Sequence, residues 1–256
     1  MTENNPPVLF ELEGSLARLT LNRPEKRNAL NDDLIAALKD GLAQAAGEKE
    51  VRVVMIKGAG SDFCSGADLS ALQKIADSSI AENAADARSL MDVFTLIRDI
   101  EVPVVAAVHG RALAGGCGLA SACDIVLASA SARFGYPEVK IGFVPAMVAA
   151  ILRRNVSEKR AFELLTLGQE ISAGEALAMG LVNRVFADET FDSDAASYVK
   201  EFQKVSRSAV ALTKKLVYQM DGLAFRDALE TGADVNVIAR MTADCQKGIA
   251  RFLKRV

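Results

Sequence analysis

The chain has 256 residues, half of them hydrophobic and a quarter charged, which is enough to bury a large core and leaves room for a smaller terminal module. Its net charge of -3 comes without a dense basic stripe, which disfavours a nucleic acid partner, and its apolar runs are too short to span a bilayer. The first residues do not resemble a signal peptide, the four cysteines lack C-x-x-C spacing and His109 is the only histidine, so we expect a cytoplasmic protein with reduced thiols and no metal.

The first predicted elements are a hairpin, a helix and a strand. Two short apolar runs within residues 7–21 flank "EGS", which suits a hairpin with Gly14 in the turn. Asn31 is a predicted N-cap for a helix whose apolar residues recur at helical spacing up to Ala45. The β-branched run "VRVVMIKG", residues 51–58, is typical of a buried strand.

The same alternation continues along the chain. Helical patterns in "ADLSALQKIA" and "ARSLMDVFTLIRDI" precede the strands "PVVAAVHG" and "IVLAS", which favours an α/β fold with a mainly parallel sheet. After about residue 145 helical spacing dominates, and "LVNRVF" is the only convincing strand. Residues 191–256 are predicted to be wholly helical. Their many apolar positions indicate that they cover the core or a neighbouring subunit.

Two strand-to-helix junctions carry only small residues. In "FCSGADL", residues 63–69, Gly66 permits a tight backbone, Ala67 leaves its N–H uncovered, and Asp68 lies near the positive end of the helix. In "ALAGGCGLASACD", residues 112–124, Gly115 and Gly116 could present bare N–H groups. A single glycine-rich turn is best explained by close packing. Two matched junctions instead favour an oxyanion hole made of two N–H donors.

Other catalytic classes fit the sequence less well. "GRALAGGCG" does not have the spacing of the dinucleotide motif G-x-G-x-x-G, and no G-x-S-x-G elbow is present for a serine hydrolase. His109, before a glycine at a strand end, is typical of a packed structural histidine. A nucleophilic Cys64 or Cys117 paired with His109 stays open as an alternative, although both cysteines suit the core better.

Ordered motifs along nearly the whole chain resemble those of the crotonase superfamily, the enoyl-CoA hydratase/isomerase family. They are "LNRPEKRNAL", "VVMIKGAGSDFCSGADL", "VPVVAAVHGRALAGGCGLASACDIVLAS", "ARFGYPEVKIGFVP" and "LTLGQEISAGEALAMGLVNRVF". The resemblance implies an α/β crotonase-like spiral of ββα units over residues 1–190, which contains the acyl-CoA site. Residues 191–256 would be a C-terminal helical module that assembles homotrimers or dimers of trimers.

The resemblance also implies the catalytic groups. The N–H groups of Ala67 and Gly115 would hold the thioester oxygen of an acyl-CoA as it becomes an enolate, and Glu138, after Pro137, would be the acid/base. Without the resemblance, Glu138 would be interpreted as an ordinary solvated glutamate. The chain departs from the family at Gly118, where hydratases usually carry a first glutamate. One carboxylate suits double-bond isomerisation, whereas water addition is served better by two.

Coenzyme A would be part of the substrate, so no separate cofactor is expected. The resemblance assigns Lys26 and Arg27 to the phosphates, although a solvated charge pair explains them nearly as well. The residues that would line or border the rest of the CoA site are Ala29, Ser65, Asp68 and Leu69.

We therefore expect a lyase of the enoyl-CoA hydratase type. The alternatives are an enoyl-CoA isomerase that uses one carboxylate, and a non-catalytic acyl-CoA-binding member of the family. Asp124, at the entry to an apolar strand, is expected to be a structural acid without a catalytic role.

Overall fold

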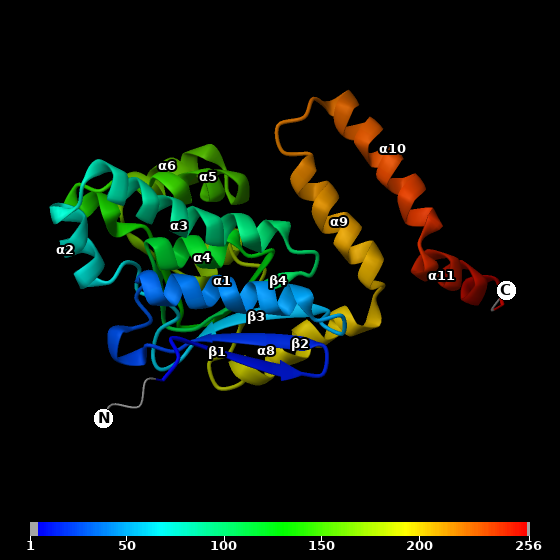
Figure 1. Ribbon diagram of the computed structural model, residues 1–256, viewed down its shortest axis with the longest axis horizontal. Helices are drawn as coiled ribbons and strands as arrows, with labels where there is room; N and C mark the ends of the chain where they lie inside the picture. Colours follow the sequence, from blue (N-terminus) through cyan, green and yellow to red (C-terminus); the bar gives the residue numbers. More distant parts are fainter. Residues whose placement is uncertain (1–4, 255–256) are drawn as a thin grey trace.

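The computed structural model describes residues 5–254, except for the side chains of Leu69, Leu72 and Ala76. A six-stranded sheet forms its centre, in the order β1-β2-β3-β4-β6-β9 (Figure 1). β1 and β2 pair antiparallel, and every later pair in this sheet is parallel, as the alternation of strands and helices predicts. The strands are β1 (Val8–Glu13), β2 (Leu16–Leu21), β3 (Val53–Gly58), β4 (Val104–Val108), β6 (Ile125–Ser129) and β9 (Arg184–Phe186).

A smaller sheet stands beside the first and has the order β5-β7-β8. β5 (Arg111–Leu113) and β7 (Arg133–Gly135) are parallel, and β8 (Glu170–Ser172) pairs antiparallel with β7. The sequence pattern did not predict β5, β7 or β8, because each has three residues and shows no clear alternation.

The large sheet is buried on both faces, and alternate side chains of each strand enter different cores. In β3, Val54 and Ile56 join the main core, while Val53 and Met55 join a smaller core on the other face. α1, α3 and α4 cover the first face and α8 covers the second, beneath β2 and β3 in Figure 1. The near-continuous apolar runs in the strands follow from this double coverage.

The helices that cover or flank the sheets are α1 (Asp32–Gly47), α2 (Leu69–Asp77), α3 (Ile80–Asp99), α4 (Gly115–Ala122), α5 (Ala146–Asn155), α6 (Glu158–Leu167), α7 (Ala173–Ala178) and α8 (Phe191–Val199). Short 3-10 turns are η1 (Pro24–Lys26), η2 (Pro137–Ile141) and η3 (Lys200–Lys204). Two local predictions are confirmed. Gly14 turns the hairpin with φ 61°, and the Asn31 side chain accepts a hydrogen bond from the N–H of Leu34.

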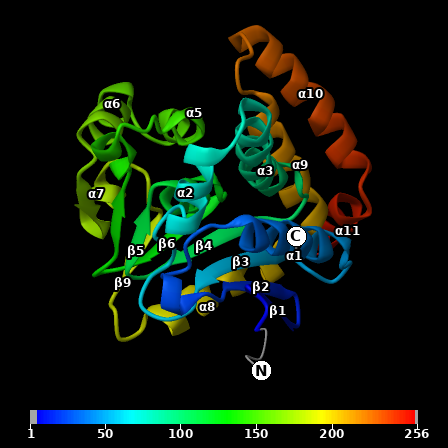
Figure 2. The same cartoon turned by 60° about the vertical axis from the view of Figure 1, so that its left-hand side comes forward.

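The last three helices form an arm that extends away from the sheets (Figures 1 and 2). They are α9 (Arg207–Gln219), α10 (Phe225–Met241) and α11 (Ala243–Leu253). α8 is also part of the expected helical module, but its Phe191, Ala195 and Val199 are buried against the sheet. α8 thus packs with the sheets, and α9 is the first helix of the arm. None of the helices within the described residues is both long and apolar enough to cross a bilayer.

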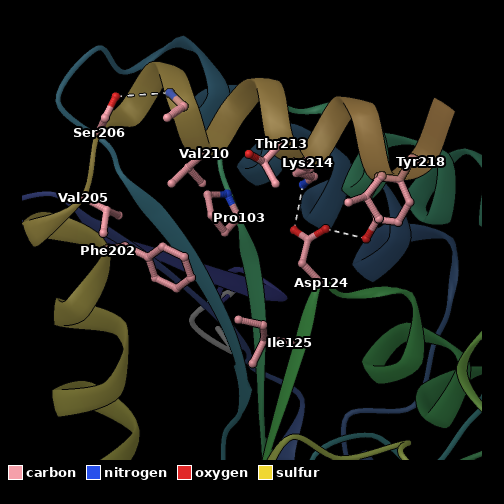
Figure 3. A pocket seen from close by; sticks show the side chains of 12 residues that line it. Pro103, Asp124, Ile125, Phe202, Val205, Ser206, Val210, Thr213, Lys214 and Tyr218 are labelled. Carbon is pink, nitrogen blue, oxygen red and sulfur yellow. Dashed lines mark hydrogen bonds and ion pairs between the residues drawn. The ribbon is translucent and has the colours of Figure 1, made fainter. Parts of the chain in front are cut away.

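A buried charge network fixes the start of the arm. The Lys214 ammonium in α9 donates to the carbonyls of Ile97 and Val102 at 2.7 and 2.9 Å, and it lies 2.8 Å from the Asp124 carboxylate. The Tyr218 hydroxyl donates to the other oxygen of Asp124 at 2.5 Å (Figure 3). Asp124 is thus a structural acid, as expected, and it joins β6 to α9.

Candidate active site

The small sheet brings the proposed acid close to the second glycine-rich junction. β5 and β7 are parallel neighbours, and Leu113 pairs with Gly135 at their carboxyl ends. The chain leaves β5 into α4, which begins at Gly115, and it leaves β7 into η2, which contains Glu138. Because parallel strands end at the same edge of a sheet, Gly115 and Glu138 start from adjacent positions.

The first junction is hydrogen-bonded to the other side of β5. The N–H of Cys64 donates to the carbonyl of Arg111 at 3.0 Å, and the N–H of Leu113 donates to the carbonyl of Cys64 at 2.9 Å. Gly66 has φ 98°, and a Cβ there would lie 2.9 Å from Cβ of Ala114. The glycine therefore serves both a left-handed backbone and a close approach between the two junctions.

Leu30 lies beside both residues proposed as N–H donors. Its N–H donates to the carbonyl of Gly66 at 2.7 Å and its carbonyl accepts from Asp68 at 2.9 Å, which leaves the N–H of Ala67 between them unused. A Cβ on Gly115 would lie 3.1 Å from Cδ1 of the same leucine. Within the described residues no hydrogen bond uses the N–H of Ala67 or of Gly115. Both groups are therefore available to an oxygen of a ligand.

Ala114, directly before α4, has a strained backbone. Its φ of 49° and ψ of -126° belong to a region that favours glycine, and such residues cost about 1–3 kcal/mol. Its N–H donates to the carbonyl of Gly135 at 2.8 Å, and its carbonyl accepts from Gly118 at 2.9 Å. Sequence reasoning missed this residue because nothing in an alanine signals a left-handed conformation. The strained residue thus directly precedes Gly115, the first residue of α4.

Glu138 has the environment that proton exchange requires. It is half-buried, and its Oε2 is buried with no hydrogen-bond partner among the described residues. Burial raises the pKa of this carboxyl above its usual 4.5. A carboxyl with a raised pKa ionises closer to neutral pH and can take up and return a proton more readily there.

The space beside Gly118, where a second carboxyl would have to start, is filled. A Cβ built on Gly118 would overlap with Cγ1 of Val148 in α5 and would touch the Phe94 ring at 3.4 Å. Gly118 is itself buried in α4. The missing first glutamate is therefore matched by a side chain from a neighbouring helix that occupies its place.

A sequence model of the family described as Enoyl-CoA hydratase/isomerase matches residues 11–256. The chain belongs to this family. A Thermus thermophilus relative that carries the name of an enoyl-CoA hydratase is 39% identical over 95% of this chain and 96% of its own length. The crotonyl-CoA hydratase of Syntrophomonas wolfei is 33% identical over 97% of this chain and 95% of its own length.

The fold comparison agrees with the sequence comparison. The crystal structure of an enoyl-CoA hydratase from Mycobacterium smegmatis matches with a TM-score of 0.93 at 32% identity, over 98% of this chain and 97% of that one. The protein is thus an enzyme of the enoyl-CoA hydratase/isomerase family, with the α/β crotonase fold and C-terminal helices.

The loop that the family resemblance assigns to CoA lies beside the first junction. Lys26 and Arg27 are exposed at the end of η1, and the Arg27 carbonyl accepts from the N–H of Ser65 at 3.0 Å. Ala29 is buried, Ser65 is half-buried, and the side chain of Leu69 lies outside the described residues. Both cations therefore face solvent, next to the segment that holds Ala67.

Asp68, another expected CoA-site residue, uses its carboxylate within the protein. One oxygen accepts from the Arg23 guanidinium at 2.7 Å, and the other accepts from the N–H of Ser70 at 3.0 Å and caps α2. These hydrogen bonds lower the pKa of Asp68 to about 2. Its side chain therefore supports the wall of the site.

Sequence reasoning missed Asn28, which shapes the same loop. Asn28 is fully buried with φ 54°, a conformation that asparagine tolerates better than most residues. Its side-chain oxygen accepts from the N–H of Arg23 at 2.9 Å, and its amide donates to the carbonyls of Ala59 and Asp62, each at 2.8 Å. The only signal was an asparagine inside a Pro-containing loop, which is too common to assign a role.

The structure disfavours a cysteine nucleophile. Burial raises the pKa of the Cys64 thiol to about 12 and that of Cys117 to about 11, so neither forms a thiolate near neutral pH. Nε2 of His109 lies 2.9 Å from the carbonyl of Gly60 and therefore donates its N–H to the backbone. Cys64 and Cys117 are both fully buried in the main core, as expected.

An apolar cleft of about 430 Å³ lies under α9 (Figure 3). Pro103 and Ile125, at the beginnings of β4 and β6, form its floor, and Phe202 and Val210 form part of its walls. It contains none of the residues expected to bind or transform an acyl-CoA. We therefore do not place the chemistry of this family there.

Proposed function

We propose that the protein adds water to a 2-enoyl-CoA thioester, with the N–H groups of Ala67 and Gly115 holding the thioester oxygen and Glu138 acting as acid/base. One observation carries the proposal. Gly115 and Glu138 leave adjacent parallel strands at the same edge of the small sheet, so a substrate carbonyl on α4 would lie next to a desolvated carboxyl. Pro137, at the first position of η2, fixes the backbone that presents this carboxyl.

A single carboxyl can carry both proton transfers because an enolate separates them. The Glu138 carboxylate takes a proton from a water molecule while the oxygen of that water forms a bond to the β-carbon. The electrons of the double bond move onto the thioester oxygen, where the N–H groups of Ala67 and Gly115 stabilise the charge. Glu138 then returns the proton to the α-carbon, the carbonyl re-forms, and the carboxylate is regenerated.

Isomerisation of a 3-enoyl-CoA is the second candidate, and the packing of Val148 against Gly118 favours it. With no room for a second carboxyl at position 118, no second acceptor stands there to orient water. Glu138 would take a proton from the α-carbon, form a dienolate on the same N–H donors, and return the proton to the γ-carbon. A non-catalytic acyl-CoA-binding protein is the remaining alternative, since the same N–H groups could bind a thioester without turnover.

We propose that Lys26 and Arg27 bind the phosphates of CoA, while Ala29, Ser65 and the Leu69 backbone border its remainder. The exposure of the two cations on one short loop supports this, since Lys and Arg side chains both form charge-assisted hydrogen bonds with phosphates. The four free cysteines fit a reducing compartment, so we keep the cytoplasm as the proposed location.

The arm supports assembly into a homotrimer or a dimer of trimers. α10 and α11 contain no buried residue in a single chain. They expose large apolar side chains that water would not favour, among them Phe225, Leu229, Met241, Phe252 and Leu253. Light scattering of the purified protein would test this, and a monomer at micromolar concentration would contradict it.

The activity is tested by giving the purified protein matched 2-enoyl-CoA and 3-enoyl-CoA thioesters and identifying the products by mass spectrometry. A 3-hydroxyacyl-CoA product supports hydration, and a moved double bond supports isomerisation. Loss of either activity in Glu138→Ala supports the assigned role, whereas an equal rate in that variant contradicts it. Calorimetric binding of thioesters without any turnover would favour the binding protein.

A further inference from the structure

The hydroxyl of Tyr136 connects the segment that carries Glu138 to α4, the helix that begins at Gly115. Tyr136 stands between β7 and η2, two residues before Glu138, and its side chain is 1% exposed. A buried phenol needs a hydrogen-bond partner. Its oxygen lies 2.9 Å from Oγ of Ser121, which belongs to α4.

The direction of these hydrogen bonds follows from proton counting. The Ser121 hydroxyl donates to the carbonyl of Cys117 at 2.6 Å, and a hydroxyl has one proton to give. Tyr136 must therefore donate to Ser121. The two bonds connect the segment that carries Glu138 to Cys117, in the first turn of the helix that begins at Gly115.

A second connection joins the same two segments at another point. The N–H of Ala114 donates to the carbonyl of Gly135 at 2.8 Å. With this backbone bond alone, residues 136–138 could still rotate relative to α4. The hydrogen bond of the Tyr136 hydroxyl is a second attachment, two residues before Glu138.

Glu138 needs such support because no other residue that the structure describes holds its buried carboxyl oxygen. Oε2 is buried with no hydrogen-bond partner among the described residues, so no such contact at that oxygen holds the group in place. Its orientation depends on the backbone beneath it. We infer that Tyr136 is a positioning residue, whose hydroxyl acts through Ser121 to hold Glu138 at a fixed distance from the N–H of Gly115. This inference rests on the function proposed for the site.

The kinetic test compares Tyr136→Phe, Ser121→Ala and their double variant with a matched control, Tyr198→Phe. The control removes a phenol hydroxyl from α8, outside the site. We expect kcat to fall about tenfold or more in Tyr136→Phe with KM within about twofold, because a misplaced acid slows chemistry more than binding. The double variant should lose no more than the larger single loss. A kcat in Tyr136→Phe equal to that of the control would overturn the inference.

A second readout does not require turnover. Carbon-13 labelling of glutamate carboxyls, with the Glu138 signal assigned by Glu138→Gln, gives the pKa of Glu138 by NMR. In Tyr136→Phe we expect that pKa to fall towards 4.5, since a loosened segment lets the carboxyl reach water; in Tyr198→Phe it should not move. If the parent protein converts neither enoyl-CoA, the proposed function fails, and the positioning role of Tyr136 is then tested by this titration alone. Equal values in the two variants would overturn the inference, and Ser121→Ala replaces Tyr136→Phe if the latter does not fold.

Discussion

The guanidinium of Arg23 donates to the carboxylate of Asp68 across 2.7 Å, although the two residues are 45 positions apart in the chain. The two side chains are only 17% and 7% exposed. Arg23 also donates to the carbonyl of Ala29 at 2.6 Å. The pair therefore joins the proposed CoA loop to the start of α2, beside the N–H of Ala67.

This relationship predicts a pH-dependent loss of stability in Asp68→Asn. Asparagine still caps α2 but leaves the guanidinium without its counter-charge, so we expect the free energy of unfolding at pH 7 to fall by about 1–3 kcal/mol. The folded-state pKa of Asp68, about 2, lies below its usual 3.8. Its contribution is therefore complete above about pH 4 and is lost as the pH falls towards 2.

Urea unfolding from pH 7 to pH 2 measures this difference. The parent and Asp68→Asn should converge across the acid window. Asp32→Asn is the control, because its ion pair with Lys74 is exposed and is largely screened by solvent. A constant gap between parent and Asp68→Asn down to pH 2 would show that the charge of Asp68 is not the cause.

Glu138→Gln should separate activity from stability. We expect its rate to fall by about 10²–10⁴, the range for loss of a general acid or base. Burial raises the folded-state pKa of Glu138, so above that pKa the ionised carboxyl destabilises the protein, and this cost disappears as the pH falls below about 4.5. Glutamine should therefore leave the melting temperature at pH 7 equal or higher, with no such advantage at pH 4. A lower melting temperature at pH 7 would mean that the carboxylate has a stabilising partner.

The sequence was sufficient for the elements with long, regular patterns. The strands of the large sheet and the cap at Asn31 follow from local periodicity and side-chain chemistry, and the structure confirms them. The two glycine-rich junctions could also be recognised locally, because their small residues are contiguous. Their contact through Cys64 and β5 could not, since it depends on how distant segments pair.

The sequence could not show which distant residues pack against a given position. Gly118 showed that a carboxyl was missing, but only the structure shows Val148 in its place. Asp124 was expected to be a structural acid, yet its partners Lys214 and Tyr218 lie about ninety positions away on a helix that periodicity alone cannot orient. The strain at Ala114 had no local signal at all.

Gly118→Glu should not create a hydratase with two carboxylates. The new Cβ would overlap with Val148, and such overpacking costs about 1–3 kcal/mol, so we expect lower stability and no gain in hydration. The double variant Gly118→Glu with Val148→Gly opens the space. It should hydrate 2-enoyl-CoA faster than Val148→Gly alone, which is the matched control.

Steady-state hydration rates of the four proteins, together with their melting temperatures, decide this. A faster rate in Gly118→Glu alone would show that α5 moves aside readily. No gain in a folded double variant would mean that a carboxyl at position 118 cannot reach the water, and it would strengthen the case for isomerisation.

The attachment of the helical arm depends on Lys214, and a double-mutant cycle should show it. Lys214→Met leaves the Asp124 charge buried without its ammonium, so we expect a loss of about 3–5 kcal/mol in the free energy of unfolding. Adding Asp124→Asn removes that orphaned charge and should restore part of the loss, while the carbonyls of Ile97 and Val102 still lack their donor. Lys215→Met is the control. Lys215 is the next residue in α9 and its side chain is exposed, so this substitution should change the free energy of unfolding by less than about 0.5 kcal/mol. Denaturant unfolding gives the free energies of the parent, Lys214→Met, Asp124→Asn and the double variant, together with that of the control. Limited proteolysis after η3 reports release of α9 from the core. If Lys214→Met and Lys215→Met unfold at the same denaturant concentration, the network does not hold the arm.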